Sequence, residues 1–322
     1  MNRPEKRLVV IAGGAGFLGS HLCEFMLKKG FKVICLDNLI TGNYDNISHL
    51  HRCSDFEFIE ADIVDFNKIR ILNKLTPNII FNLASPASPK DYYIYPIETL
   101  KAGSQGTLNL LEIARTNNAI FVQASTSEVY GDPLVNPQPE SYWGNVNPTG
   151  PRSVYDEAKR FAEALTMSYH RVYTVPVRIA RIFNTYGPRM KFDDGRVIPS
   201  LIYQALTHQP LTILGTGRQT RSFCYVSDMI IGLYRLLRCS DPHPINLGNP
   251  HEVTILQLAQ SIKKLTHSDS PYKFLPAPPD DPKRRNPDIT RAVKLIGWTP
   301  KVELEKGLLL TIKWFKRNLK IR

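Results

Sequence analysis

The sequence contains few cysteines, and their positions argue against two kinds of site. Five cysteines are scattered along 322 residues, and no two of them form a C-x-x-C pair. An odd number without such spacing indicates neither a disulfide framework nor a zinc site, so we expect no metal. Unpaired cysteines fit a reducing compartment.

Long hydrophobic runs are also lacking. After residues 1–7, only five apolar residues precede Gly13, which is too few for the core of a signal peptide. A membrane-spanning helix needs about 20. Internal repeats and low-complexity segments do not occur either. The sequence therefore predicts a cytoplasmic protein with no membrane partner.

Positive charge is abundant but dispersed. The formal net charge is +12, yet lysine and arginine are spread along the chain except in the tail, residues 313–322. A nucleic-acid-binding surface needs a basic patch or stripe, so we expect no nucleic-acid partner. We interpret the tail as the solvated end of a basic helix, and we assign part of the excess charge to a small polyanionic substrate.

What the sequence does contain is enough apolar material for a full core, at 43% hydrophobic residues. Its length suits one large α/β domain and a smaller one. An apolar run, Leu8–Ala12, breaks at the glycine-rich segment 13–19 and continues as a helical pattern to Lys29. This pattern predicts a strand, a glycine turn and a helix.

The glycine-rich segment is typical of a dinucleotide site. Gly13, Gly16 and Gly19 allow a sharp turn, close approach of the backbone to a pyrophosphate, and packing of helix on strand. The helix that begins there supplies N–H donors and its dipole. We expect Phe17 and Leu18 to contact the cofactor together with these glycines.

The next predicted strand, Lys32–Leu36, is followed directly by Asp37. This carboxylate lies 24 residues after Gly13, where it can accept hydrogen bonds from the adenosine ribose. It would repel a 2′-phosphate, so NAD is predicted in preference to NADP. Asn38, beside it, is placed in the same cofactor site.

Further strands are expected at 56–60, 78–84, 119–124 and 175–181, and helices at 97–117 and 154–173. Their alternation predicts an α/β fold with a Rossmann-type, doubly wound parallel sheet. The strand-end residues expected at the cofactor are Asp62, Ile63, Leu83 and Ala84. Asp62 either binds the adenine amine or caps the next helix.

Segment 83–96 (LASPASPKDYYIYP) also follows a predicted strand. Its prolines argue against a regular helix and predict a rigid loop. Because ligands of such sheets bind at the carboxyl ends of the strands, this loop is expected beside the site.

Two polar clusters flank a loop rich in proline and glycine. Thr126, Ser127 and Glu128 follow a strand, and Tyr155 and Lys159 are four residues apart, which on a helix puts both on one face. An ammonium beside a phenol favours the phenolate, and the pKa of Tyr must fall about three units from roughly 10 to serve as a base near neutral pH. A Tyr-x-x-x-Lys pair alone could equally be a surface pair, but here it accompanies a dinucleotide pattern.

Together these motifs resemble the extended short-chain dehydrogenases/reductases, which act mostly on nucleotide sugars. Within that family, STSEVYGDP, LASPAS, GPRSVYDEAKR and RIFNTYGPRM closely resemble the UDP-glucuronate decarboxylases, over about residues 8–318. The 4,6-dehydratases carry Asp where this chain has Ser127, and simple 4-epimerases carry a small residue in place of Glu128. An epimerase or dehydratase is the alternative enzyme. A non-catalytic NAD-binding protein is disfavoured because Tyr155 and Lys159 are both present.

The resemblance implies a mechanism. Tyr155 takes the C4 hydroxyl proton of UDP-glucuronate while NAD takes the hydride, Lys159 holds the nicotinamide ribose, and Thr126 positions the C4 oxygen. The resulting β-keto acid loses CO2, and the returned hydride gives UDP-xylose. Ser127 and Glu128 either order a water or supply the acid that reprotonates C5.

The substrate-binding residues that the resemblance implies are Tyr92 or its neighbour Tyr93, Asn184, Arg189, Arg221 and Arg285. Asn184 and Arg221 are assigned to the diphosphate. Arg285 is assigned to the diphosphate or to the sugar carboxylate, because a planar guanidinium suits either anion. Many family members carry Asn where this chain has Gly103, so a polar contact is expected to be missing.

Two domains are predicted. Residues 1–182 form the NAD-binding domain, to which about 226–250 return, and residues 183–322 bind the nucleotide sugar. Within the second domain we expect a strand at Leu211–Leu214 and a loop at 219–221. By resemblance, a homodimer forms through a four-helix bundle made from helices 97–117 and 154–173.

Overall fold

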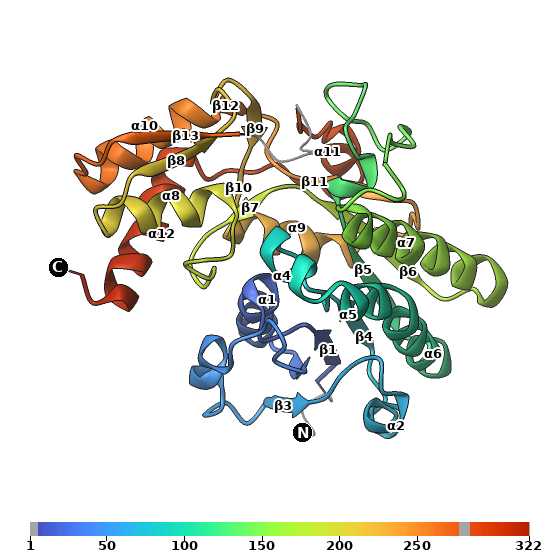
Figure 1. Ribbon diagram of the computed structural model, residues 1–322. Helices are drawn as coiled ribbons and strands as arrows, with labels where there is room; N and C mark the ends of the chain where they lie inside the picture. The colour runs from blue at the N-terminus through green and yellow to red at the C-terminus, as the bar shows by residue number, and fades with distance from the viewer. Residues whose placement is uncertain (1–5, 277–283, 322) are drawn as a thin grey trace.

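A computed structural model describes residues 6–276 and 284–321 of the chain. Its central feature is a parallel seven-stranded sheet in the order β11-β6-β5-β4-β1-β2-β3 (Figure 1). The strands are β1 (Leu8–Ala12), β2 (Lys32–Asp37), β3 (Phe56–Glu60), β4 (Ile79–Asn82), β5 (Ile120–Thr126), β6 (Val177–Ile182) and β11 (Ile245–Leu247). The strand order reverses between β1 and β4, the point at which ligands of doubly wound sheets bind.

Both faces of this sheet are covered, as its near-continuous apolar strands require. In β1, Val9 and Ile11 point into one buried cluster while Val10 and Ala12 point into the other. The helices that flank the sheet are α1 (Phe17–Lys28), α5 (Pro96–Lys101), α6 (Thr107–Asn117), α7 (Ser153–Tyr173) and α9 (Val226–Leu236). Helix α1 packs beside α9, and α7 packs beside α5 and α6. The period of two along each strand thus places a layer of helices on either side.

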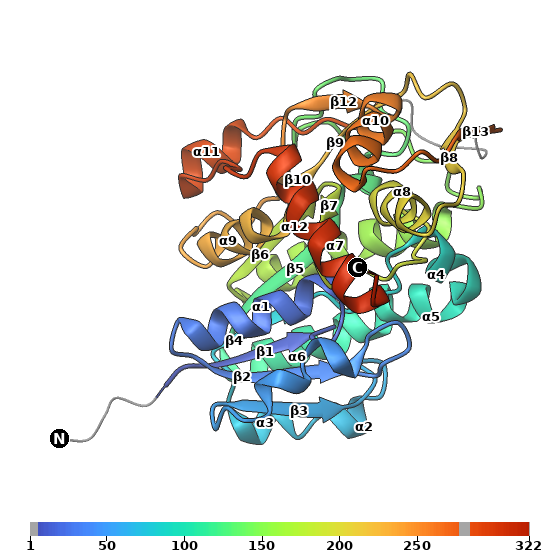
Figure 2. The same cartoon turned by 90° about the vertical axis from the view of Figure 1, so that its left-hand side faces the viewer.

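A smaller part of the molecule lies beyond the carboxyl ends of the strands (Figure 2). Its helices are α8 (Val197–Leu206), α10 (Ile255–Thr266), α11 (Thr290–Ile296) and α12 (Leu304–Leu319). Its strands are β7 (Thr185–Tyr186), β8 (Leu211–Leu214), β9 (Thr220–Ser222), β10 (Cys224–Tyr225), β12 (Glu252–Thr254) and β13 (Tyr272–Leu275). They form three two-stranded pairs, β10 with β7, β12 with β9 and β13 with β8.

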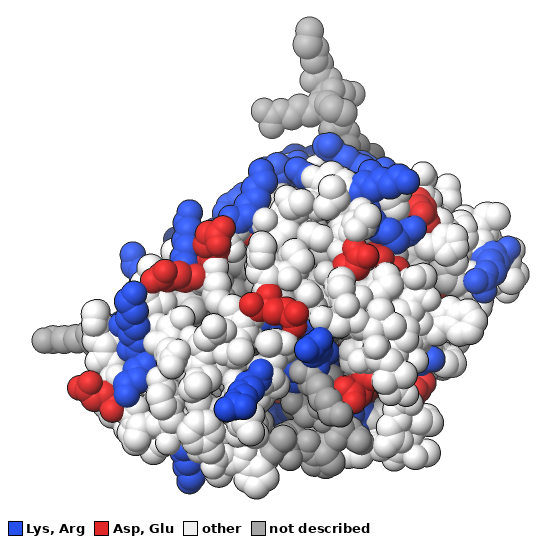
Figure 3. Space-filling view, turned by 90° about the horizontal axis from the view of Figure 1, so that it is seen from above, with Lys and Arg blue, Asp and Glu red and all other residues white. Residues whose placement is uncertain are grey.

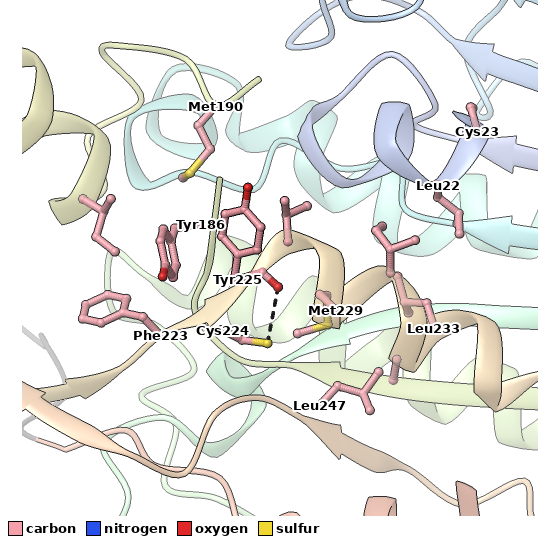
Figure 4. Close-up of a cluster of buried hydrophobic side chains, with 14 of the residues drawn as sticks. Leu22, Cys23, Tyr186, Met190, Phe223, Cys224, Tyr225, Met229, Leu233 and Leu247 are labelled. Atoms are coloured by element: carbon pink, nitrogen blue, oxygen red, sulfur yellow. Dashed lines mark hydrogen bonds between the residues drawn. The ribbon is translucent and has the colours of Figure 1, made fainter. Parts of the chain in front are cut away.

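One continuous hydrophobic cluster joins the two parts (Figure 4). Leu22 from α1 and Leu233 from α9 lie in the same cluster as Tyr186 and Tyr225 from the short strands beyond the sheet. The site between the two parts is therefore held by packed apolar side chains as well as by polar contacts.

The structure confirms the doubly wound parallel sheet, with strand ends shifted by at most two residues. Two local predictions are wrong. The proline-rich segment contains a helix, α4 (Pro89–Ile94), because proline is favoured in the first turn and Ser88 caps the helix by accepting a hydrogen bond from the Asp91 N–H. The predicted loop at 219–221 instead enters strand β9, which pairs antiparallel with β12.

The long helix predicted at 97–117 is interrupted. Between α5 and α6, residues Ala102–Gly106 form a π-helical turn. A Cβ on Gly103 would lie 2.7 Å from the backbone oxygen of Ala158 on α7. Gly103 therefore permits a close contact between this turn and α7. A larger residue such as Asn would clash with α7 at this position.

Strand β11 lies at the edge of the main sheet beside β6, although it follows α9 late in the chain. The proposed domain boundary at 182/183 remains a prediction. Residues 277–283 lie outside the described part, so nothing is assigned to the first half of the DDPKRRNP stretch.

No helix of the described residues is long and apolar enough to cross a membrane. Within 6–276 and 284–321, no group of three or more His, Cys, Asp or Glu side chains is arranged to hold a metal ion. Figure 3 shows lysine and arginine side chains along one margin of the molecule, with acidic side chains interspersed on the same face.

Candidate active site

A cavity of about 1700 Å³ lies between the carboxyl ends of the sheet strands and the smaller part. It brings together every residue that the sequence assigned to cofactor, sugar or phosphates. The wall includes Gly13, Gly16, Phe17, Leu18, Gly19, Asp37, Asn38, Asp62, Ile63, Leu83, Ala84, Tyr92, Thr126, Ser127, Glu128, Tyr155, Lys159, Asn184, Arg189, Arg221 and Arg285. Their common placement is a fact of the structure, while their individual roles remain predictions.

The glycine turn forms a cradle that side chains would fill. Gly13 has φ +76°, and a Cβ there would lie 2.8 Å from the Ala84 nitrogen. A Cβ on Gly19 would lie 2.0 Å from the Gly13 oxygen. Helix α1 begins at Phe17 without a side-chain cap, so its first N–H groups remain for an anion. The turn therefore fits a dinucleotide pyrophosphate.

Asp37 ends β2 at the rim of this cradle. Its carboxylate accepts hydrogen bonds from the Ala15 and Leu39 N–H groups, both at 2.9 Å. Burial raises the pKa of Asp37, and these backbone donors oppose that shift. The carboxylate retains acceptor capacity for ribose hydroxyls, so its position fits an adenosine.

Asp62 accepts hydrogen bonds from the Asn38 side chain and from the Val64 N–H, at 2.9 and 2.8 Å. It does not cap the following helix. Asp65 does so, by accepting from the Lys68 N–H at the start of α2 (Phe66–Ile69). The helix-cap alternative for Asp62 is therefore wrong, and its adenine role stays a prediction.

Tyr155 and Lys159 share one face of α7, as their spacing predicts. The Lys159 Nζ donates to the Ala124 oxygen at 3.0 Å and lies 5.6 Å from the centroid of the Tyr155 ring. Tyr92 of α4 stacks on Tyr155, with ring centroids 5.4 Å apart. Tyr92 thus packs against Tyr155, whereas Tyr93 also lines the cavity but is half exposed, so which of them meets the substrate stays a prediction.

The expected effect of lysine on the phenol is not what this structure shows. Burial, followed by the negative charge of Glu128, raises the pKa of Tyr155. Burial alone lowers the pKa of Lys159 to about 8. The reason is geometric: the ammonium is bound to a backbone carbonyl, and the phenol is enclosed near a carboxylate.

Strand β5 delivers the second polar cluster. It ends at Thr126, whose Oγ1 accepts a hydrogen bond from the Glu128 N–H at 3.2 Å and so begins the 3-10 turn Ser127–Tyr130. Both Thr126 and Ser127 are buried. The turn aims the Glu128 carboxylate into the cavity wall.

Two arginines clamp Glu128. Arg285 donates to both carboxylate oxygens, at 2.5 and 2.7 Å, and Arg152 donates to Oε2 at 2.8 Å. Burial opposes ionisation of Glu128, but the charges of Arg285 and Arg152 hold its pKa below the usual value. Glu128 is therefore a carboxylate in this structure and is not poised to donate a proton.

Arg152 was missed by the sequence reasoning. It lies three residues before Tyr155, so helical spacing could have placed it on the same side of α7. Arg196 was missed as well: it lines the cavity, is oriented by the buried Asp194 at 2.8 Å, and its charge acts on Tyr155.

The remaining predicted ligands have protein partners in this structure. Asn184 donates to the Ser222 oxygen at 3.4 Å, and Arg189 pairs with Glu24 of α1 at 2.6 Å. Arg221 is buried and donates to the Thr220 oxygen at 2.9 Å. Each still lines the cavity.

Comparison with known proteins agrees with this geometry. The model of the family described as GDP-mannose 4,6 dehydratase matches residues 10–311. UDP-glucuronic acid decarboxylase 4 of Arabidopsis thaliana is 50% identical over 97% of this chain and 69% of its own length. UDP-glucuronic acid decarboxylase 1 of Danio rerio is 48% identical over 99% of this chain and 75% of its own. The chain belongs to the UDP-glucuronate decarboxylase family.

A solved structure extends the comparison for this member of the UDP-glucuronate decarboxylase family. UDP-glucuronic acid 4-epimerase from Bacillus cereus, in complex with UDP-glucuronic acid and NAD, has a TM-score of 0.83 and is 30% identical. The match covers 97% of this chain and 99% of the epimerase chain. The decarboxylase family thus shares its fold with an epimerase that binds the same acid.

Proposed function

We propose that this protein is an NAD-dependent UDP-glucuronate decarboxylase that forms UDP-xylose and CO2. The observation that carries the assignment is one cavity wall that combines Tyr155, Lys159 and Thr126 with Glu128. Identity near 50% to UDP-glucuronic acid decarboxylases over almost the whole chain supports the same reaction.

The cofactor is NAD. The glycine cradle at the start of α1 holds the pyrophosphate, and Asp37 accepts from the adenosine ribose. Asp37 would lie against any 2′-phosphate, where two negative charges repel. When bound, NAD accepts a hydride from C4 of the sugar and returns it at the end of the cycle.

Tyr155 takes the proton of the C4 hydroxyl, and Thr126 holds the C4 oxygen. Lys159 binds the nicotinamide ribose from its place between α7 and the end of β5. Burial and Glu128 raise the pKa of the phenol, and a bound oxidised nicotinamide would supply a positive charge that favours the phenolate.

Oxidation at C4 turns the C5 carboxylate into that of a β-keto acid. The C5–C6 bond then breaks, CO2 leaves, and the electron pair passes into an enolate at C4 and C5. Arg152 and Arg285 form the cationic side of the cavity, and their guanidinium groups suit the sugar carboxylate. Of the two alternatives for Arg285, we therefore favour the sugar carboxylate over the diphosphate. Asn184 and Arg221 bind the diphosphate.

Reprotonation at C5 completes the carbon chemistry. Of the two alternatives for Ser127 and Glu128, ordering a water fits better than direct donation, because Glu128 is ionised between two arginines. The water donates the proton to C5, and the carboxylate and the hydroxyl fix its position.

A homodimer is proposed from the helices that face solvent. Ile97 on α5 and Phe161 on α7 are 54% and 52% exposed. The two helices pack together in one chain, so their outer faces form one surface that a second copy can cover. We also propose a cytoplasmic location.

The alternative enzyme is a nucleotide-sugar epimerase or dehydratase on the same fold. The two classes separate when UDP-glucuronate and UDP-glucose are supplied in parallel with NAD. The proposal predicts CO2 from the acid and no turnover of the neutral sugar. Conversion of UDP-glucose, or of the acid without CO2, would contradict it.

A further inference from the structure

Asp156 is a buried carboxyl that the reaction as described does not use. It follows Tyr155 on α7 and is 5% exposed. Its Oδ1 is buried and finds no hydrogen-bond partner among the described residues. A buried carboxyl without such bonds is costly as an anion, so its state of protonation responds to its neighbours.

Those neighbours are the charges of the site. The titratable and charged groups that act on Asp156 are Glu128, Arg285, Arg152, Glu157 and, from the side of α4, Tyr92, with Tyr155 adjacent in sequence. Arg152 lies one turn earlier, just before α7 begins, and both arginines donate hydrogen bonds to Glu128. Asp156 therefore shares the field of the cluster without being bonded within it.

Within the described residues, the groups that act on Asp156 carry charges of both signs. Glu128 is a carboxylate, and Arg152 and Arg285 are guanidinium groups. The carboxylate of the glucuronate sugar brings a further negative charge to the same place. The carboxyl most easily neutralised is Asp156. Glu128 accepts two hydrogen bonds from Arg285 and one from Arg152, whereas Asp156 Oδ1 accepts none from the described residues.

We propose that Asp156 takes up a proton from solvent when the sugar carboxylate binds, and thereby offsets the negative charge that the sugar adds beside the Glu128–Arg152–Arg285 cluster. Asp156 is thus a positioning residue for an anionic sugar, and the inference rests on the proposed function. In support, burial, and then the charge of Glu128, raise the pKa of Asp156 to about 7. A further negative charge moves that pKa higher, so binding and protonation favour each other.

A purely structural reading of Asp156 makes a different prediction. An acid in the first turn of a helix is stabilised by the helix dipole and by free N–H groups. On that reading Asp156 stays ionised, and its loss lowers stability without changing any proton stoichiometry. The two readings therefore differ in a quantity that can be measured on the intact protein.

The first test needs no variant. Protein loaded with NADH binds UDP-glucuronate without turnover, and calorimetry in buffers of different ionisation enthalpy, near pH 7.5, counts the protons taken up. The inference predicts net uptake of up to one proton per site with UDP-glucuronate, and none with UDP-glucose. Equal uptake with both ligands, or none with either, would overturn it.

The second test uses Asp156→Asn, which keeps the shape and mimics the neutral acid. Proton uptake is lost, and the KM for UDP-glucuronate becomes flat above pH 7, where that of the unaltered protein rises up to tenfold per pH unit. Glu305→Gln, at an exposed position in the first turn of α12 that does not line the cavity, leaves both quantities unchanged. If KM depends on pH in Asp156→Asn as it does in the unaltered protein, the inference is wrong. If UDP-glucuronate does not bind the unaltered protein, the proposed function is wrong instead.

Discussion

Tyr155 shows how one side chain combines two demands. It must be enclosed to meet the sugar and the cofactor, yet enclosure beside Glu128 raises its pKa. Tyr155→Phe removes only the hydroxyl and leaves the stacking on Tyr92 possible. We expect turnover to fall about 10²- to 10⁴-fold, the range for a lost acid–base group, with NAD affinity unchanged.

That prediction is checked by steady-state turnover of UDP-glucuronate alongside NAD binding. Tyr93→Phe, an exposed phenol next to the site, is the matched control and should turn over normally. Near-normal turnover in Tyr155→Phe would show that the phenol is not the base.

Glu128 acts at a different step from Tyr155. Glu128→Gln removes the charge that two arginines bind, so ordering of the C5 proton donor is lost while C4 oxidation can proceed. Slowing a step after oxidation should make NADH or a 4-keto sugar accumulate during turnover. Absorbance of NADH in a single turnover measures it, and loss of activity without any NADH would place Glu128 at the oxidation step.

Local sequence spacing predicted several site residues but not the contacts between distant ones. Asp37, Tyr155 and Lys159 are read from local patterns, since their geometry is set by one helix or one strand end. The clamp on Glu128 comes from Arg152, 24 residues away, and from Arg285, 157 residues away. No local rule links such positions, and the shifted pKa values follow from that long-range arrangement.

At the scale of elements, the contact between α7 and the π-helical turn decides where the catalytic helix lies. Gly103→Ala would place a Cβ 2.7 Å from the Ala158 backbone oxygen, which cannot rotate away. We predict a lower melting temperature and lower turnover, because α7 carries both Tyr155 and Lys159. Overpacking of this kind costs about 1–3 kcal/mol.

Thermal unfolding measures the effect of Gly103→Ala. Ser104→Ala in the same turn removes only a hydroxyl that donates to the Leu100 oxygen and is the control. An unchanged melting temperature in Gly103→Ala would mean that the turn is free to move away from α7.

A second contact between elements predicts a pH effect. The Nε2–H of His21 on α1 donates to the Pro188 oxygen at 2.9 Å, next to the Arg189–Glu24 pair. Burial, and then the charge of Arg189, lower the pKa of His21 to about 4. The unfolded chain, with a His pKa near 6.5, binds more protons between these values, so stability falls as pH drops from about 6.5 to 4.

The His21 contribution is at most about 3 kcal/mol, the full difference in pKa expressed as free energy. His21→Gln keeps a donor but does not titrate, so its melting temperature should depend less on pH across that interval. An identical pH dependence in both proteins would exclude His21 as the cause.

The elements themselves were predictable where the pattern was strong. Strands Leu8–Ala12 and Lys32–Asp37 are apolar runs bounded by glycine or acid, and α7 has a clear start and period. Helix α4 was not predicted because prolines usually interrupt helices, whereas Pro89 occupies the first turn of α4, where proline is tolerated. The two-residue strands β7 and β10 are too short for any periodicity and form through tertiary pairing.

For the whole molecule, the alternation of strands and helices predicts the doubly wound sheet, and the sheet in turn predicts where ligands meet. The return of β11 to the sheet edge, and the cluster that joins α1 to α9 and the short strands, depend on long-range packing (Figure 4). The site therefore lies between two parts that share one core.

The most direct measurement follows the sugar carbons. NAD-loaded protein is incubated with UDP-glucuronate labelled with ¹³C throughout the sugar and observed by NMR until the reaction ends, with NADH absorbance recorded in parallel. The account predicts that C6 appears as CO2 and bicarbonate, that C1 to C5 appear in UDP-xylose, and that no net NADH remains. Retention of C6 in a C4 epimer of the acid, or an unchanged substrate, would contradict the decarboxylase assignment.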